Sequence, residues 1–132
     1  METSILPAMS AHLPAFRLGD IRGVYPNDLD YDFAVQFAQA FAHHFALRGT
    51  IAVGRDMRAS SVTLQDGLLK GFTSAGINVV NLGLCTTELG YFASVAEDIE
   101  AVIIVTASHN PARYNGFKSV LSNGVGIHFE NG

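Results

Sequence analysis

The stretch Ala101-Val102-Ile103-Ile104-Val105-Thr106-Ala107-Ser108-His109-Asn110-Pro111 determines how this chain is expected to fold. Its first five residues are apolar and mostly β-branched, a composition typical of a strand buried on both faces in a parallel sheet. Pro111 disfavours helical backbone at the residue before it, so 106–111 is predicted to be a turn. Ligand sites in such sheets lie just beyond the carboxyl ends of the strands. The hydroxyl of Ser108 is therefore predicted to lie at a functional edge of the sheet.

A long amphipathic helix is predicted before this stretch. Four phenylalanines recur at every fourth position between residues 33 and 45, which places their rings on one helix face that packs against the sheet. Asp30 is a suitable N-cap and Gly49 stands where a C-terminal cap belongs, so the helix is expected to begin after Asp30 and to run to Leu47. We interpret the aromatic stripe as core and not as a cofactor site.

The rest of the chain alternates between strand and helix patterns. Strands are expected at 50–54, 77–82, 101–105 and 117–121, and a turn with a short strand at 124–129. One helix is expected from the N-cap candidates Ser60 and Ser61 to about Ala75, closed by Gly76, and another over 87–97. This order predicts an α/β fold with three layers, α/β/α, around a mostly parallel, mixed sheet. Residues 1–15 show no period and are expected to form a flexible tail.

Length and composition restrict the possible functions. The chain has 132 residues, 48% of them hydrophobic, which is enough for one compact domain. Its net charge of -4 disfavours nucleic acid or an anionic membrane as the main partner. No apolar stretch approaches the roughly 20 residues that span a bilayer, and no secretory signal is evident, so a cytoplasmic location is expected. Cys85 is the only cysteine, which excludes an internal disulfide and a thiolate zinc site.

The cationic side chains are concentrated near polar motifs, although the chain as a whole is acidic. Only Arg48 and Lys70, of eight lysines and arginines, fall on a predicted helix or directly after one. The others lie in or beside the motifs described next: Arg17, Arg22, Arg55, Arg58, Arg113 and Lys118. This distribution indicates one local site for an anion.

Four polar motifs occur in a fixed order along the chain. They are Asp20-Ile21-Arg22-Gly23, Gly54-Arg55-Asp56, the Thr-Ala-Ser-His-Asn-Pro turn at 106–111, and Asn115-Gly116-Phe117-Lys118. Together they resemble the first domain of the α-D-phosphohexomutases, the family of phosphoglucomutases, phosphomannomutases and phosphoglucosamine mutases. The resemblance covers residues 16–121, and the form of the serine turn is highly specific to that family.

The resemblance implies an isomerase that interconverts hexose 1-phosphates and hexose 6-phosphates. In the family the serine of this turn is a phosphoserine that exchanges its phosphoryl group with the sugar, through a hexose 1,6-bisphosphate that also acts as activator. By resemblance, Ser108 is the phosphoserine and supplies one oxygen ligand to Mg²⁺. His109 and Lys118 are candidates for proton transfer or charge stabilisation, and Arg22 is a phosphate-side cation. We expect Ser108, Lys118 and Arg22 to lie at one edge of the sheet.

The chain also departs from the family pattern. The family's other metal ligands lie in an Asp-Gly-Asp-x-Asp-Arg loop of a second domain, which this sequence lacks. We therefore expect residues 16–132 to be an incomplete domain I, to lack domains II–IV and to be inactive as a mutase alone. The segment Thr86-Thr87-Glu88-Leu89 is similar to the bacterial phosphomannomutase branch and favours mannose. Gly19 replaces an aromatic residue of many relatives, which puts sugar contacts there in doubt.

Several alternatives stay open. Within the family, the enzyme could be a phosphoglucomutase or a phosphoglucosamine mutase, and a non-catalytic module that binds phosphosugars is an alternative of another class. Arg55 and Arg58 are expected to brace loops through ion pairs more than to contact substrate. A serine hydrolase is disfavoured because the chain has no Gly-x-Ser-x-Gly elbow and no third triad member.

Overall fold

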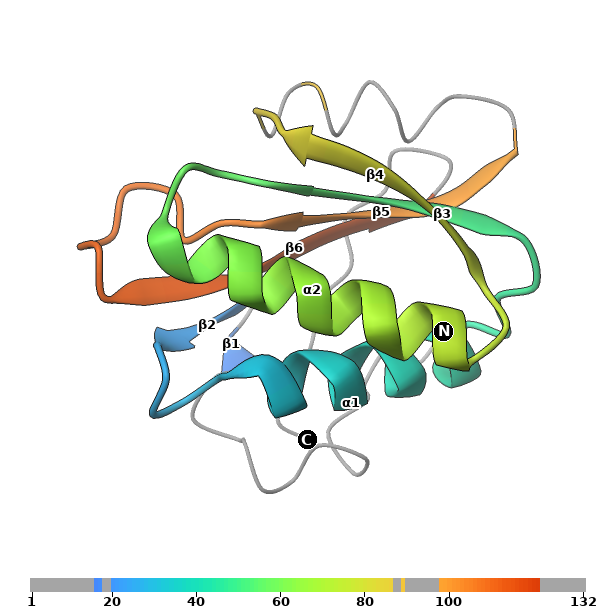
Figure 1. Cartoon of the computed structure of the whole chain (residues 1–132), viewed down its shortest axis with the longest axis horizontal. Helices are drawn as coiled ribbons and strands as arrows, with labels where there is room; N and C mark the ends of the chain where they lie inside the picture. The colour runs from blue at the N-terminus through green and yellow to red at the C-terminus, as the bar shows by residue number, and fades with distance from the viewer. Residues whose placement is uncertain (1–15, 18–19, 87–88, 90–97, 122–132) are drawn as a thin grey trace.

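The computed structural model describes residues 16–17, 20–86, 89 and 98–121, which form a sheet with two helices (Figure 1). The described sheet has six strands in the order β1-β2-β6-β5-β3-β4. The strands are β1 (Phe16–Arg17), β2 (Asp20–Val24), β3 (Thr50–Arg55), β4 (Asn78–Leu84), β5 (Ile99–Val105) and β6 (Tyr114–Leu121). The helices are α1 (Tyr31–His44) and α2 (Ala59–Ser74).

The sheet is mixed, as the sequence predicts. β3 pairs in parallel with β4 and β5, whereas β6 runs antiparallel to β5 and to β2. β2 therefore runs in the same direction as β3, β4 and β5. The strand at β2 was not among the predicted elements, and β6 begins at Tyr114 instead of Phe117. The helix expected over 87–97, apart from helical Leu89, the tail at 1–15 and the strand at 124–129 fall outside the described residues.

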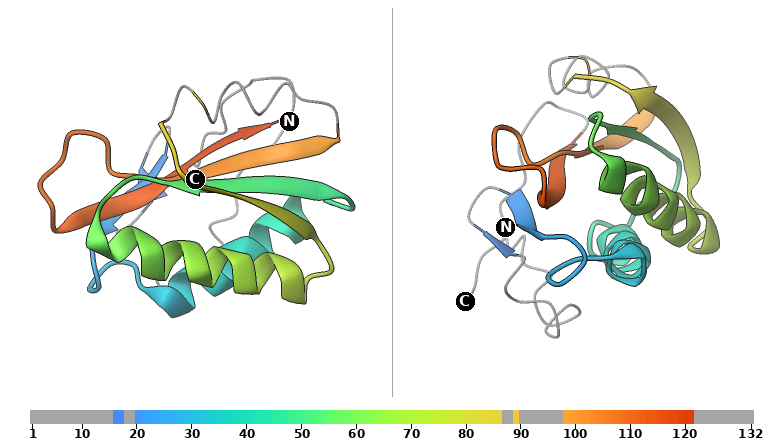
Figure 2. Two further views of the ribbon diagram at one scale, coloured as in Figure 1. Left: turned by 45° about the horizontal axis from the view of Figure 1, so that its top comes forward. Right: turned by 60° about the vertical axis from the view of Figure 1, so that its left-hand side comes forward.

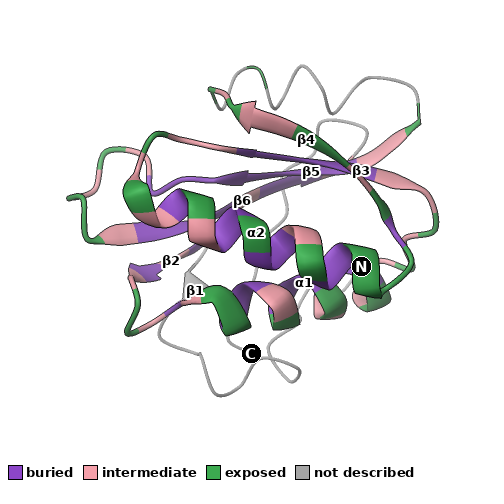
Figure 3. Ribbon diagram, viewed as in Figure 1, coloured by how far each residue is buried: buried purple, intermediate pink, exposed green. Residues whose placement is uncertain are grey.

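Helices α1 and α2 both cover the same face of the sheet (Figure 2). Figure 3 shows their inner sides and the central strands as buried. The phenylalanine stripe of α1 lies in this core and contacts Phe117 of β6, with the Phe37 and Phe117 ring centroids 4.9 Å apart. The opposite face has a smaller buried cluster, Ala52, Val102 and Ile104. None of the helices in the described ranges is long and apolar enough to cross a membrane.

Helix α1 begins as predicted but ends early. The Asp30 carboxylate accepts a hydrogen bond from the Phe33 amide (2.8 Å), which confirms Asp30 as the N-cap. The C-terminal cap at Gly49 was wrong, because the helix ends at His44 and Ala46 takes the left-handed backbone (φ 51°). The Gly49 amide instead donates to the Glu100 side chain of β5 (2.5 Å).

Helix α2 also begins differently from the prediction. Its N-cap position is Arg58, which makes no side-chain capping bond, so Ser60 and Ser61 are not caps. Both serines lie in the first turn and accept hydrogen bonds from Asn115 of β6. The end of the helix is as expected: Gly76 follows it with φ 82°, a backbone conformation that glycine adopts at little cost.

Candidate functional site

Ser108 lies in the turn between β5 and β6, at the end of the sheet where α2 begins (Figure 1). Its side chain is half-buried, and the adjacent His109 is exposed. Ser108 takes the left-handed backbone conformation (φ 56°), which is uncommon for serine. Its amide donates to the Thr106 hydroxyl (3.0 Å), so the backbone on the N-terminal side of Ser108 is fixed by a side chain.

Lys118 and Arg22 lie on neighbouring strands close to this turn. Lys118 of β6 is opposite Ile104, and Arg22 of β2 is opposite Gly116. Directly opposed residues of antiparallel strands point to the same face, and side chains alternate along a strand. Since Phe117 faces the helices, Lys118 and Arg22 project from the face that the two helices leave uncovered. The Gly116 carbonyl accepts from the Thr106 amide (2.9 Å), so Arg22 lies level with the start of the serine turn.

Gly116 allows these strands to approach closely. A Cβ atom at this position would overlap the carbonyl oxygen of Ile21 in β2. The motif Asn-Gly-Phe-Lys therefore requires its glycine for strand packing beside the site, a reason that a single sequence does not reveal.

Arg58 braces the serine turn, as expected, although mostly through carbonyl groups. Its Nε donates to Asp56 (3.1 Å) in an ion pair, and its two terminal nitrogens donate to four carbonyl oxygens of the turn. These carbonyls belong to Ser108 (3.0 Å), Asn110 (2.7 Å), Pro111 (2.7 Å) and Tyr114 (3.2 Å). Arg55 donates from Nη1 to the Asp56 carbonyl (3.2 Å).

A second set of hydrogen bonds supports Arg58 from the start of α2. Asp56 accepts from the Arg58 amide (3.1 Å) and from the Ser61 hydroxyl (2.6 Å). Asn115, which is fully buried at the other end of the turn, donates to the hydroxyls of Ser60 (2.8 Å) and Ser61 (2.9 Å). The start of α2 therefore holds both ends of the segment that carries Ser108.

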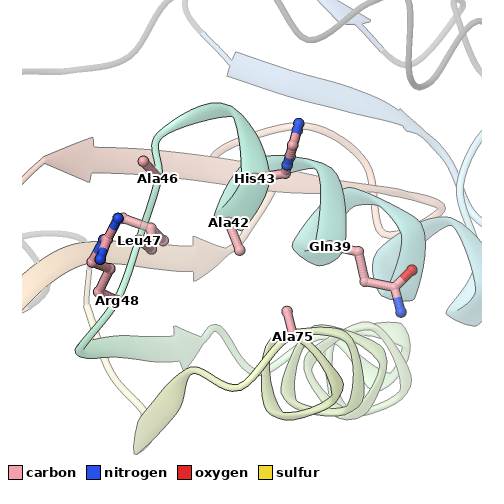
Figure 4. Close-up of a pocket in the computed structure, with 7 residues that line it drawn as sticks. All are labelled: Gln39, Ala42, His43, Ala46, Leu47, Arg48 and Ala75. Carbon is pink, nitrogen blue, oxygen red and sulfur yellow. The ribbon is translucent and has the colours of Figure 1, made fainter.

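A cavity of about 400 Å³ lies next to the site, on the same face of the sheet as Lys118. It is lined by Asp56, Met57, Leu84, Cys85, Thr86, Ile104 and Thr106. Partial burial raises the pKa of the Cys85 thiol, although the Arg55 backbone opposes this effect. A larger cavity of about 530 Å³ lies at the C-terminal ends of α1 and α2 and contains none of the predicted site residues (Figure 4).

Comparison with known proteins identifies the class. Residues 14–131 match the family described as phosphoglucomutase/phosphomannomutase, alpha/beta/alpha domain I. The chain therefore belongs to the phosphoglucomutase/phosphomannomutase family, and its α/β fold is that of the family's first domain.

Individual relatives carry both names of the family. A protein from Neisseria meningitidis serogroup B named phosphoglucomutase is 42% identical over 80% of this chain and 24% of its own length. A Klebsiella pneumoniae protein named phosphomannomutase is 39% identical over 91% of this chain and 76% of its own length. A crystal structure of a phosphoglucomutase/phosphomannomutase family protein from Burkholderia thailandensis superposes with a TM-score of 0.77 at 35% identity, over 85% of this chain and 27% of that one.

The chain spans only 24% of the length of the Neisseria relative and of the Xanthomonas campestris phosphohexose mutases that it matches. The family is generally dependent on Mg²⁺. Among the residues that the structure describes, no group of three or more His, Cys, Asp or Glu side chains could hold a metal ion. Mg²⁺ requires near-octahedral oxygen coordination, so the described residues do not form a magnesium site by themselves.

Proposed function

We propose that this chain supplies the phosphoserine domain of a phosphohexomutase that acts on mannose phosphates. The observation that carries the proposal is the placement of Ser108 at the carboxyl end of β5, next to the strands that bear Lys118 and Arg22. A phosphoserine carries about −1.5 to −2 charges, and two cations that project from the same sheet face would compensate them. Phosphoryl transfer depends chiefly on positioning and charge compensation, which this arrangement supplies.

The proposed reaction moves one phosphoryl group in each direction. The bond between phosphorus and Ser108 Oγ breaks, and a bond from phosphorus to a sugar hydroxyl oxygen forms. The sugar hydroxyl proton passes to a nearby base, for which His109 is the candidate, and the leaving Ser108 Oγ takes up one proton, for which Lys118 is the candidate donor. After the bisphosphate reorients, its other phosphoryl group returns to Ser108 Oγ, and these proton transfers run in reverse. Lys118 and Arg22 stabilise the charge on the transferring group, and Ser108 would contribute one oxygen to the Mg²⁺ that the complete enzyme holds.

Glucose phosphate is the second candidate substrate, because the relatives from Neisseria are named phosphoglucomutase. The Klebsiella and Escherichia coli relatives named phosphomannomutase, together with Thr86-Thr87-Glu88-Leu89, support mannose. The whole activity is proposed for a longer protein that contains this chain. The chain alone would lack carboxylate ligands for the metal and a cleft that excludes water.

The test is a coupled mutase assay of the gene product that contains this chain, with mannose 1-phosphate, glucose 1-phosphate and the matching hexose 1,6-bisphosphates. We expect turnover, a higher kcat/KM for mannose 1-phosphate, and one phosphate on the peptide that contains Ser108 by mass spectrometry. Ser108→Ala should abolish both the phosphate and the turnover, whereas Ser74→Ala on the exposed end of α2 should change neither. A gene product without mutase activity that still binds sugar phosphates would favour the non-catalytic module. Sustained turnover by the 132-residue chain alone would show that the domain assignment is wrong.

A further inference from the structure

The conformation of Ser108 is set by contacts on both sides of the residue. The left-handed region is unfavourable for a non-glycine residue, and such a conformation persists when the surrounding structure fixes it. On one side, the Ser108 amide donates to Thr106 Oγ1 (3.0 Å). On the other side, the Ser108 carbonyl accepts from Arg58 Nη2 (3.0 Å). These two bonds orient both peptide groups of Ser108, and the peptide orientations determine the direction of the Cα–Cβ bond from which its hydroxyl extends.

The donors of Arg58 are all used within the protein. A guanidinium has five N–H donors in a rigid planar fork. In this structure Nε donates to Asp56, Nη1 to Pro111 and Tyr114, and Nη2 to Ser108 and Asn110. The Arg58 side chain is only 13% exposed. Arg58 therefore has no N–H group left for a substrate phosphate, which distinguishes it from a ligand-binding arginine.

The carbonyls that Arg58 binds are far from it in the sequence but close together in the turn. They lie 50 to 56 residues away, between Ser108 and Tyr114, so one side chain binds four carbonyl oxygens spread along the turn. Bonds to a charged donor are about twice as strong as neutral ones. Lysine could not replace this contact, because an ammonium has three donors and no planar fork.

We propose that Arg58 is a positioning residue that holds Ser108 in its left-handed conformation and so directs the Ser108 hydroxyl toward the transferring phosphoryl group. The second half of this statement rests on the proposed mutase function, whereas the first half does not. The Asp56 carboxylate orients the guanidinium by accepting a hydrogen bond from Arg58 Nε. The Thr106 hydroxyl restrains Ser108 from its other side by accepting a hydrogen bond from the Ser108 amide. Arg58 acts through the backbone of the turn and does not contact the reacting atoms.

The conformational half is tested by hydrogen exchange on this chain. Arg58→Met keeps the alkyl stem and removes all five donors. We expect faster amide exchange in peptides covering 107–114 and unchanged exchange in β5. Arg48→Met, at the opposite end of the molecule, is the matched control and should leave both segments unchanged. Equal exchange of the turn in wild type and Arg58→Met would overturn the proposal, whatever the enzymatic activity of the gene product proves to be.

The functional half is tested by kinetics in the gene product that contains this chain. A misplacement of about 1 Å can lower turnover about 10²-fold, so Arg58→Met should lower kcat by about 10²-fold with KM for the sugar phosphate nearly unchanged. Arg58→Lys should restore little of the lost kcat, although it keeps the charge. Thr106→Val should lower kcat as well. The factor by which Thr106→Val lowers kcat should be smaller in the Arg58→Met variant than in wild type, because Thr106 and Arg58 both restrain Ser108.

Two kinetic outcomes would contradict this role. A raised KM with unchanged kcat would indicate that Arg58 binds substrate, and a lowered melting temperature with unchanged kcat per folded molecule would indicate a purely structural role. If wild type itself shows no mutase activity, the proposed function fails and the functional half with it, while the exchange experiment still decides the conformational half.

Discussion

The two faces of the sheet differ in what their side chains contribute. On the face covered by α1 and α2, five fully buried phenylalanines pack into one aromatic core: Phe33, Phe37, Phe41, Phe72 and Phe117. The other face has a buried cluster of three small and medium side chains and carries Lys118 and Arg22 beside it. β6 serves both faces, because Phe117 and its neighbour Lys118 point in opposite directions. The same strand therefore supplies one side chain to the hydrophobic core and one to the candidate site.

This comparison separates two kinds of substitution. A change on the helix-covered face should lower the free energy of unfolding and leave the properties of each folded molecule intact. A change at Lys118 should instead lower activity and leave the free energy of unfolding nearly unchanged, because a half-exposed cation contributes little to the core.

The largest effect is expected at Phe37. Its ring contacts Phe41 and Phe117, with centroid distances of 5.6 and 4.9 Å, and is fully buried. Phe37→Ala should lower the free energy of unfolding by about 3–5 kcal/mol, because it removes apolar contacts and leaves a cavity. Urea denaturation followed by circular dichroism measures the change, and Phe37→Leu should cost less. A loss below 1 kcal/mol would mean that the aromatic core is not the main source of stability.

A change at Lys118 should affect activity more than stability. Removing one charge-stabilising donor typically lowers kcat by about 10²–10³-fold, and this loss is expected for Lys118→Met in the gene product that contains the chain. The melting temperature should stay within about 2 °C, since the expected change in stability is within about 0.5 kcal/mol. Lys70→Met, on an exposed position of α2, is the control and should alter neither quantity. Unchanged kcat would remove Lys118 from the site.

Local sequence signals predicted the central parts of this architecture. The apolar run 101–105 was sufficient to place β5 and the turn after it, because a buried strand and an X-Pro turn are both determined by neighbouring residues. Asp30 was predicted correctly for the same reason, since its carboxylate binds an amide three residues away.

Contacts between distant residues could not be predicted in this way. β2 pairs with β6, whose partner residues lie 90 to 96 positions later in the chain, so no local signal marks it as a strand. Ser61 has the sequence appearance of a helix cap, but Asp56 and Asn115 use its hydroxyl instead. The hydrogen bonds from Arg58 to the carbonyl groups of the serine turn likewise connect residues that are 50 to 56 positions apart. The family resemblance predicted the charged residues of the candidate site, whereas the contacts around the serine turn required the fold.

A smaller effect is expected at the start of α1, on the helix-covered face. Asp30→Ala removes the capping bond to the Phe33 amide and should lower the free energy of unfolding by about 0.5–2 kcal/mol. Asp32→Ala changes an exposed carboxylate in the first turn that makes no capping bond, so its effect should be smaller. Urea denaturation of the two variants beside wild type measures the difference. Equal losses would show that helix-dipole charge, and not the capping bond, matters at this end.

The smallest effect is expected at Cys85, which packs against the cluster on the opposite face. Partial burial raises the pKa of its thiol, because burial disfavours the thiolate more than the thiol. The folded chain should therefore be alkylated by iodoacetamide with a midpoint at higher pH than the same chain unfolded in urea, where the thiol titrates near about 8.5. The sign for stability follows: below the unfolded pKa both states hold the proton, and as pH rises from there through the folded pKa, stability falls. Cys85→Ala should lack this component of the decline in stability at alkaline pH. Equal alkylation midpoints in the folded and unfolded chain would mean that this face leaves Cys85 as accessible to water as an unfolded thiol.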